Sequence, residues 1–345
     1  MVNHTKKLNG NVHAAVDLAC AQSALGHEVF VCSGTGDFDQ LLYENNVGVI
    51  NVEFRRNASS LVKSILLLRQ IIKNRKIEIV HAHMMLSAII SWFSSRFLKA
   101  SFVTTAHNAF ERSSLLMGLG DRVIAVSENV KKTMIKKGIR EAKIRTVLNG
   151  TIGAARLKSL NKEGRILERG SIMFIGGLHP RKGVIDLINA YDKIFRLGET
   201  PRLYIVGEGP HRREYESFCR TLSSNGNITF LGPTDDPLSL LRFADIFVLA
   251  SHADPAPLVL AEARQAGCAI IGTRVDGIPE LLNGGKSGIL VRAGDVLELA
   301  EAMSSLTHNV SNLRTWKENS QIDIEFLNIE RVARATLDVY YEIYK

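Results

Sequence analysis

Short apolar segments rich in Val and Ile alternate with longer segments of helical period along the whole chain. The first half contains EVFVCS, GVINVEF, IEIVHAH, FVTTAHN, RVIAVS and IRTVLNG. After a polar interval, the pattern resumes with SIMFIGG, RLYIVGEG, NITFLG, DIFVLAS, CAIIGT and GILVRAG. Buried parallel strands that alternate with helices produce this pattern. The sequence therefore predicts an α/β protein of two doubly wound domains.

The polar interval at 153–169 divides the two series of strands. Glycines interrupt the helical period there, so we expect these residues to form a linker. A first domain is then predicted at 1–152 and a second at 170–327. Residues 328–345 have apolar positions spaced as on one face of a helix, which predicts a C-terminal closing helix.

The first domain lacks one expected element. A doubly wound domain opens with a strand before its first glycine loop. Only a short, mostly polar segment precedes Gly10 in this chain, and a segment of helical period follows at once. We therefore predict that the chain starts after its own first strand.

Composition excludes several classes of protein. The 345 residues are 46% hydrophobic and 23% charged, as in globular proteins. The four cysteines have neither C-x-x-C spacing nor histidine partners, which argues against a disulfide framework or a zinc site and favours a reducing cytoplasm. No apolar run approaches the ~18 to 20 residues of a spanning helix, and the first residues are too polar for a signal peptide. We expect a cytoplasmic protein that is soluble or peripheral on a membrane.

Charge is distributed unevenly between the two halves. Residues 1–150 carry 20 Lys and Arg against 11 Asp and Glu, whereas residues 151–345 carry 23 against 24. A basic half beside a neutral half indicates an anionic ligand or surface on one side only. Because the sequence has no zinc finger and no aromatic-rich RNA-binding strand, a nucleic acid is not the expected partner.

Segment 61–76, LVKSILLLRQIIKNRK, combines apolar and basic positions. Ile65, Leu68 and Ile72 lie near one another at helical spacing and are expected mainly to pack on the sheet. Its cations, together with others in the same half, can form a positive face: Lys63, Arg69, Lys73, Arg75, Lys76, Arg96, Lys99, Lys131, Lys132, Lys136 and Lys137. We therefore expect peripheral attachment to an anionic membrane surface and a lipid-linked acceptor.

The strongest candidate site lies in the second half, where SIMFIGG runs into GLHPRKGVIDLINAY. A glycine-containing turn that opens a helix presents free N–H groups, and Arg181 and Lys182 add full charges. Two cations at a helix start oppose the helix dipole unless an anion lies beside them. The segment predicts a phosphate site, the alternative being that one cation or both are solvated residues of a first helical turn.

A second group of candidates follows DIFVLAS. Asp254 lies at the strand's carboxyl end and Glu262 on the next helix, at the edge where open α/β sheets bind ligands. The N–H groups of Leu258 and Val259 can bind phosphate, and Glu262 can accept hydrogen bonds from two ribose hydroxyls. Acids around a helix start are more often caps, but the two cations nearby favour a binding site.

The motifs of both halves resemble those of glycosyltransferase family 4, GT-B fold, along nearly the whole chain. The second-half motifs are FIGGLHPRKG, VGEGP, FLG, ADIFVLAS, an E-x7-E-like acid pair and GIPE at 277–280. The first-half motifs are GHEV at 26–29, HAH at 81–83, TTAHN at 104–108, AVSE at 125–128 and LNG at 148–150. Each motif is weak alone, but their joint order and spacing are specific.

The resemblance implies two Rossmann-like domains facing a cleft, with a nucleotide-sugar donor on the second and an acceptor on the first. It implies retention of the anomeric configuration, with the donor's β-phosphate assisting deprotonation of the acceptor and no metal or other cofactor. Lys182, Arg181 and the amides near Leu258 then stabilise the leaving diphosphate. Asp254 reaches toward the donor sugar, and His107 contacts it.

Further residues are assigned to the donor by the same resemblance. Glu208 and Gly209 shape the nucleotide pocket, and Gly232 and Pro233 lie near the base. An alternative interpretation is that Gly209 and Gly232 are simple turn residues, and both interpretations can hold together. His81 and His83 are open to interpretation as core residues at a strand end, which we favour for His81.

The chain departs from the family pattern at three positions. Asp254 replaces the first Glu of E-x7-E, which shortens its reach by one methylene. Many members carry Arg where this chain has Gly177, so Arg181 either substitutes for it or the diphosphate is held less tightly. The resemblance implies that the amide of Gly10 binds a donor phosphate, but the short N-terminus curtails the glycine loop to which it belongs.

Asp37 and Asp39 form a D-x-D pattern, which is typical of metal sites. The GT-B resemblance uses no metal there, and a turn is the simpler interpretation.

The function expected is sugar transfer to a glycan or lipid-linked acceptor in envelope polysaccharide or glycolipid synthesis. Two alternatives remain open: a non-catalytic nucleotide-sugar-binding subunit of a partner enzyme, and a GT-B nucleotide-sugar epimerase. A dehydrogenase is excluded because no G-x-G-x-x-G follows a strand and opens a helix.

Overall fold

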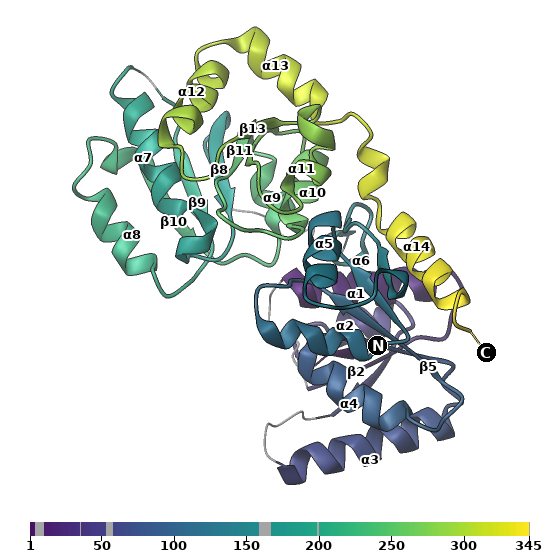
Figure 1. Ribbon diagram of the computed structural model, residues 1–345. Coiled ribbons are helices and arrows are strands. Elements are labelled where there is room, and N and C mark those ends of the chain that lie inside the picture. Colours follow the sequence, from purple (N-terminus) through teal and green to yellow (C-terminus); the bar gives the residue numbers. More distant parts are fainter. Residues whose placement is uncertain (4–9, 35, 53–57, 159–166, 199, 345) are drawn as a thin grey trace. The chain divides into compact units, whose positions relative to one another are not determined.

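The computed structural model describes residues 1–3, 10–34, 36–52, 58–158, 167–198 and 200–344. The chain forms two compact units, each on its own parallel sheet (Figure 1). Unit 1 comprises residues 1–159 and 327–345, and unit 2 comprises residues 160–326. The predicted α/β class is confirmed.

The sheet of unit 1 has the strand order β3-β2-β1-β4-β5-β6-β7. Its strands are β1 (Val2–Asn3), β2 (Phe30–Ser33), β3 (Gly48–Asn51), β4 (Ile79–His83), β5 (Ser101–Ala106), β6 (Arg122–Ala125) and β7 (Ile144–Thr146). The order reverses between β1 and β4, which makes the carboxyl ends of these strands a topological switch point. Every residue of β5 is buried, as expected for a strand covered on both faces.

The prediction that the first strand is absent is wrong. Val2 pairs with Cys32 of β2 and with Ala82 of β4, so the first residues of the chain occupy the centre of the sheet. The amino group of Met1 also donates to the Phe30 carbonyl at 2.6 Å. The sequence pattern did not reveal this strand because it is only two residues long.

Helices cover this sheet. In the described part of unit 1 they are α1 (Gly10–Ala24), α2 (Asp39–Glu44), α3 (Ala58–Asn74), α4 (Met85–Ser95), α5 (Glu128–Lys136), α6 (Ala155–Lys158) and α14 (Ile329–Tyr341), with 3-10 turns η1 (Arg112–Leu119) and η2 (Glu141–Lys143). Helix α5 begins where the Ser127 hydroxyl accepts the N–H of Val130 at 3.3 Å, an N-cap. Among the described residues, no helix is long and apolar enough to cross a membrane.

The predicted linker contains part of unit 1. Helix α6 lies within residues 153–169, and its Arg156 bonds the Asp17 carboxylate of α1 at 3.2 Å. Thr151 donates to the same carboxylate at 2.6 Å. Both charged side chains are buried, so this ion pair holds the end of the first chain segment to α1.

The closing helix also belongs to unit 1 and is observed as α14, coloured yellow in Figure 1. The Asn328 side chain caps it by accepting the N–H of Glu330 at 2.8 Å. Its residues Val332 and Leu337 lie in one core cluster with Leu18 of α1 and Val103 of β5. The last residues of the chain therefore complete the core that the first residues begin.

The sheet of unit 2 has the order β10-β9-β8-β11-β12-β13. Its strands are β8 (Ser171–Ile175), β9 (Leu203–Val206), β10 (Ile228–Gly232), β11 (Ala244–Leu249), β12 (Ala269–Thr273) and β13 (Ile289–Val291). Its described helices and 3-10 turns are η3 (Pro180–Lys182), α7 (Val184–Phe195), α8 (Arg212–Cys219), η4 (Asn225–Asn227), α9 (Pro237–Leu241), α10 (Leu258–Gln265), α11 (Ile278–Leu281), η5 (Asn283–Gly285), α12 (Val296–Thr307), α13 (Val310–Asn319) and η6 (Ile324–Leu327). The strand order reverses between β8 and β11, and the loops after these two strands carry Arg181, Lys182 and Asp254.

Candidate active site

Two loops meet at the switch point of unit 2. Arg181 and Lys182 lie in η3 after β8, and Asp254 follows β11. Lys182 donates to the Asp254 carboxylate, and the Arg181 guanidinium donates to the Ala253 carbonyl at 2.5 Å. The structure thus brings together both predicted cations and the first predicted acid.

Glycine allows this close approach. Gly183 has a φ of +64°, and a Cβ at this position would lie 1.9 Å from the Ala250 carbonyl oxygen. Only glycine fits both constraints. On the same side, the N–H of His252 donates to the Arg181 carbonyl at 2.8 Å. The cation-bearing turn therefore packs directly on the loop after β11.

The predicted phosphate-binding amides open helix α10. Leu258 and Val259 are its first two residues and follow Pro257. N–H groups in the first turn of a helix have no acceptor within the helix. Glu262 lies one turn further on, on the same face as Leu258, and its side chain is buried. This helix start offers N–H groups and a carboxylate, and it begins four residues after Asp254, the partner of Lys182.

The predicted nucleotide turns lie side by side. The N–H of Gly207 donates to the Gly232 carbonyl at 2.8 Å, and that of Leu178 donates to the Glu208 carbonyl at 2.9 Å. Gly209 approaches Leu178 so closely that a Cβ would lie 2.3 Å from its carbonyl oxygen. The three loops after β8, β9 and β10 therefore form one surface.

The side chains on this surface differ in exposure. Glu208 is exposed and accepts from Arg212 at 2.7 Å, and this bond lowers its pKa. Gly232 has a φ of +81°, and Pro233 beside it is exposed. At Gly177 a Cβ would lie 3.1 Å from the His179 ring, so an Arg there would require His179 to move.

Asp276 is a site residue that the sequence interpretation missed. It follows β12 with a φ of +46°, a left-handed backbone that is uncommon for a residue other than glycine. Burial raises its pKa, and the Asp254 carboxylate adds to the shift. The next residue, Gly277, donates its N–H to the Asp254 carbonyl at 3.3 Å. The Asp-Gly dipeptide predicts a turn here, but not its contact with Asp254.

Histidines gather at the switch point of unit 1. His107 follows β5, is half-buried and lies 2.9 Å from His83 of β4, measured between Nε2 and Nδ1. Burial lowers the pKa of His107 to about 4. His81 is fully buried, as we favoured from the sequence, with one ring nitrogen 2.6 Å from the Tyr340 hydroxyl.

The remaining first-half candidates contribute less. Gly10 is the first residue of α1, and the loop before it, 4–9, lies outside the described residues. Asp39 opens α2, and the Phe38 ring packs in the core of unit 1 against His13. The Asp37 to Asp39 segment thus leads into a helix, close to the turn that we favoured.

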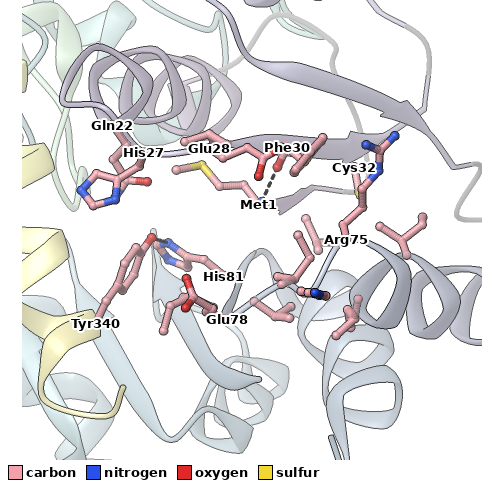
Figure 2. A pocket seen from close by; sticks show the side chains of 18 of the residues that line it. Met1, Gln22, His27, Glu28, Phe30, Cys32, Arg75, Glu78, His81 and Tyr340 are labelled. Atoms are coloured by element: carbon pink, nitrogen blue, oxygen red, sulfur yellow. Dashed lines mark hydrogen bonds between the residues drawn. The ribbon is translucent and has the colours of Figure 1, made fainter. Parts of the chain in front are cut away.

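A hollow of about 210 Å³ lies beside β1 (Figure 2). Its lining includes Phe30, Ile79 and Arg75. The hydrogen bond from the Met1 amino group to the Phe30 carbonyl joins two of the lining residues. Phe30 and Ile79 begin β2 and β4, so the hollow lies at the amino ends of the strands. Open α/β sheets bind their ligands at the other edge, and the predicted site does not include it.

Family models match both halves of the chain. Residues 8–151 match the model described as Glycosyltransferase Family 4, and residues 169–309 match Glycosyl transferases group 1. The chain belongs to glycosyltransferase family 4. The resemblance drawn from its motifs is thereby confirmed.

Curated relatives of this family 4 glycosyltransferase match parts of it. N-acetyl-alpha-D-glucosaminyl L-malate synthase of Bacillus anthracis is 30% identical over 54% of the chain and 49% of the relative. Glycogen synthase of Mycobacterium tuberculosis is 28% identical over 76% of the chain and 68% of the relative. The capsular glycosyltransferase CapM of Staphylococcus aureus is 24% identical over 59% and 56%. The chain thus spans about half to two thirds of the length of these relatives.

Solved structures match the whole chain. A glycosyltransferase from Rickettsia africae has a TM-score of 0.82 at 21% identity, covering 100% of this chain and 97% of that one. Anabaena HepE, in complex with UDP and glucose, has a TM-score of 0.81 at 18% identity, covering 98% and 97%. These likenesses confirm the GT-B fold.

Proposed function

We propose that this chain transfers a sugar from a nucleoside diphosphate sugar to a glycan or lipid-linked acceptor, with retention of the anomeric configuration. The observation that carries the proposal is the convergence of Lys182, Arg181 and Asp254 at the switch point of unit 2. The names of its relatives, which include a capsular polysaccharide enzyme, support a role in envelope polysaccharide or glycolipid synthesis.

Stabilisation of the leaving group is the main task of the site. Breaking the anomeric C–O bond leaves negative charge on the diphosphate. Lys182 and Arg181 stabilise that charge, together with the N–H groups at the start of α10. An ammonium has three donors, so Lys182 binds a phosphate oxygen while it keeps its bond to Asp254. The step as proposed uses no metal and no other cofactor.

Two carboxylates orient the rest of the donor. Glu262 accepts hydrogen bonds from the ribose hydroxyls, and its burial makes each such bond stronger than it would be in water. Asp254 is held by Lys182 and by the Ser251 hydroxyl at 3.4 Å, and its free lone pairs face the donor sugar. Because Asp is one methylene shorter than Glu, the sugar lies closer to the loop after β11 than in members with Glu.

Ligand binding and turnover test this proposal together. We expect one of UDP-, GDP-, ADP- or dTDP-sugars to raise the melting temperature, because a ligand of the native state stabilises it. UDP-glucose is the first choice because HepE binds it. The same donor should then be hydrolysed or transferred in the presence of EDTA, with the product's anomeric proton showing retention. Binding without turnover would favour a non-catalytic subunit, and no binding of any donor would refute the donor site.

We also propose that unit 1 attaches to an anionic membrane surface, which supports a lipid-linked acceptor. Helix α3 exposes Val62, Leu66 and Leu67, and α4 with the residue after its cap exposes Phe93 and Phe97. Phe97 is 87% exposed, which is unusual for a large apolar side chain. Exposed apolar groups on two adjoining helices favour insertion into the headgroup region.

Cations join these two helices. The Arg69 guanidinium of α3 donates to the Arg96 carbonyl after α4 at 2.7 Å. Arg96 itself lies over the rings of Trp92 at 4.6 Å and Phe97 at 5.1 Å. Each such cation contributes about 1 kcal/mol near an anionic bilayer. Apolar and basic groups thus lie on one surface.

Vesicle sedimentation tests the attachment. Binding should require anionic lipid and weaken with added salt as screening grows. It should fall when Lys73, Arg75 and Lys76 are neutralised, and also in Leu66→Ser with Phe97→Ser. Neutralising Arg314 of unit 2, an exposed cation, is the matched control. Equal binding to neutral vesicles, or none to anionic ones, would instead favour a soluble acceptor.

A further inference from the structure

Three histidines of the unit 1 sheet form a row that runs to its carboxyl edge. His81 and His83 alternate along β4 and so point to the same face, and His107 follows the neighbouring strand β5. Ring centroids lie 4.3 Å apart for His81 and His83, and 5.2 Å apart for His83 and His107. The rings therefore form a continuous row that ends at His107.

The last two rings share a hydrogen bond. His83 Nδ1 lies 2.9 Å from His107 Nε2. Burial lowers the pKa of His107 to about 4 and holds that of His83 well below its ordinary value, so both rings are neutral at physiological pH. A neutral imidazole has one donor and one acceptor nitrogen. One of these two nitrogens must therefore carry a proton while the other does not.

Burial decides which nitrogen donates. The other nitrogen of His83, Nε2, is buried and has no hydrogen-bond partner among the described residues. Among backbone groups, a buried N–H without an acceptor is rarer than a carbonyl without a donor, and we apply the same preference to the ring nitrogens. The proton of His83 therefore lies on Nδ1 and is donated to His107. Because His107 Nε2 accepts this bond, the proton of His107 lies on its own Nδ1.

We propose that His83 is a positioning residue that fixes the tautomer of His107, so that His107 presents an Nδ1–H donor to the sugar. The tautomer rests on the hydrogen bonds of unit 1 alone, whereas the sugar contact rests on the proposed function. A donor N–H binds a hydroxyl or ring oxygen and cannot take up a proton. His107 thus binds a sugar oxygen through this N–H and does not act as a base at Nδ1.

His81 holds His83 in place. Its Nδ1 lies 2.6 Å from the Tyr340 hydroxyl and its Nε2 lies 2.6 Å from Thr105 Oγ1. With both nitrogens engaged the ring cannot turn, and Figure 2 shows it beside Tyr340 of α14. Among the described residues, the titratable groups that act on the pair are His81 and the amino group of Met1, while Tyr340 bonds His81 and not a ring of the pair. None of them donates to His107 in its place.

Nitrogen NMR measures the tautomer directly. In the full chain with 15N-labelled histidine, long-range proton–nitrogen correlations distinguish a protonated ring nitrogen from an unprotonated one. We expect His107 to show a protonated Nδ1 and an unprotonated Nε2, with its signals assigned from His107→Gln. A protonated Nε2 on His107 would overturn the proposal. No donor is added, so the result holds whether or not the chain transfers sugar.

Two variants of His83 test its role. His83→Leu removes the donor, so both tautomers of His107 should appear, while burial still keeps the pKa of His107 low. His83→Asn places an amide N–H near the former Nδ1 and should keep the single tautomer and the low pKa. A single tautomer of His107, protonated on Nδ1, in the Leu variant would refute the role. If that variant does not fold, the wild-type tautomer and the Asn variant decide.

Activity adds a further readout once a donor is known. We expect the KM for the donor to rise about tenfold in His83→Leu with a smaller change in kcat, and the Asn variant to recover most of that loss. A purely structural role would lower the amount of folded enzyme and leave KM unchanged. Equal KM values in all three proteins would refute the sugar contact while leaving the tautomer intact.

Discussion

Lys182 of η3 donates a hydrogen bond to the Asp254 carboxylate, which joins the loops after β8 and β11. The side chains are 14% and 8% exposed. Removing one partner of such a buried ion pair destabilises the fold by more than the pair's net contribution to stability. The reason is that the remaining charge is left buried and poorly solvated. Substitution of either residue is therefore expected to weaken donor binding and to destabilise the loop that carries its partner.

Lys182→Ala should remove a charge-assisted contact to the diphosphate. We expect a loss on the order of 1.5–3 kcal/mol in donor binding or in the barrier to transfer, with the fold retained. Calorimetric Kd values and kcat/KM measure the loss, and Arg314→Ala is the control. Wild-type affinity and rate in the Lys182 variant would show that the diphosphate binds elsewhere.

Glu262→Gln should weaken binding of the nucleotide itself. A buried carboxylate accepts ribose hydroxyls more strongly than an amide does, so the Kd for the nucleoside diphosphate should rise about tenfold. The 2′,3′-dideoxy nucleotide provides the sharper comparison, since it lacks both hydroxyls and should bind both proteins with nearly equal affinity. Glu318→Gln, on an exposed face, is the matched control. An equal loss with the dideoxy nucleotide would argue against a ribose contact.

Gly183→Ala should destabilise unit 2. Its Cβ would lie 1.9 Å from the Ala250 carbonyl oxygen at a φ of +64°, and we expect a cost on the order of 1–3 kcal/mol or more. Gly226→Ala is the control, because nothing lies within 4 Å of its Cβ. Urea unfolding followed by circular dichroism compares the two. Equal stability would mean that the turn does not need its close approach to β11.

Residues added before Met1 should raise stability and reduce its dependence on pH. Burial lowers the pKa of the Met1 amino group below 8.0. Between the folded and unfolded pKa values the unfolded chain binds more protons, so this group lowers stability as pH falls below about 8. A peptide bond at this position does not titrate, and its N–H can still donate to Phe30.

Melting temperatures between pH 6 and 8.5 measure this effect as the difference between the two proteins. The buried histidines are present in both proteins, so their effect on the melting temperature cancels in the difference. Parallel curves for the extended and unextended chains would contradict the burial of the amino group.

The site loops of unit 2 were predictable because each couples a buried strand to a turn of recognisable residues. The phosphate turn at Arg181 and Lys182 follows a strand that is apolar after Ser171, and the strand order then places Asp254 beside it. The first strand was not predictable, since Val2 is its one apolar residue. The bond between His83 and His107 depends on the register of β4 and β5, in which His83 pairs with Thr105. The spacing of apolar residues does not determine which residues of two neighbouring strands lie opposite one another.

The return of α14 to unit 1 has a consequence for synthesis on the ribosome. Unit 2 is one continuous segment, whereas the core of unit 1 needs residues from both ends of the chain. Domains generally fold as units while the chain emerges, the N-terminal one first. Here that order is inverted, because the segment made first must wait, incomplete, until the last helix leaves the exit tunnel. Nascent chains halted before Ile329 should therefore protect unit 2 from protease and leave unit 1 open to cleavage.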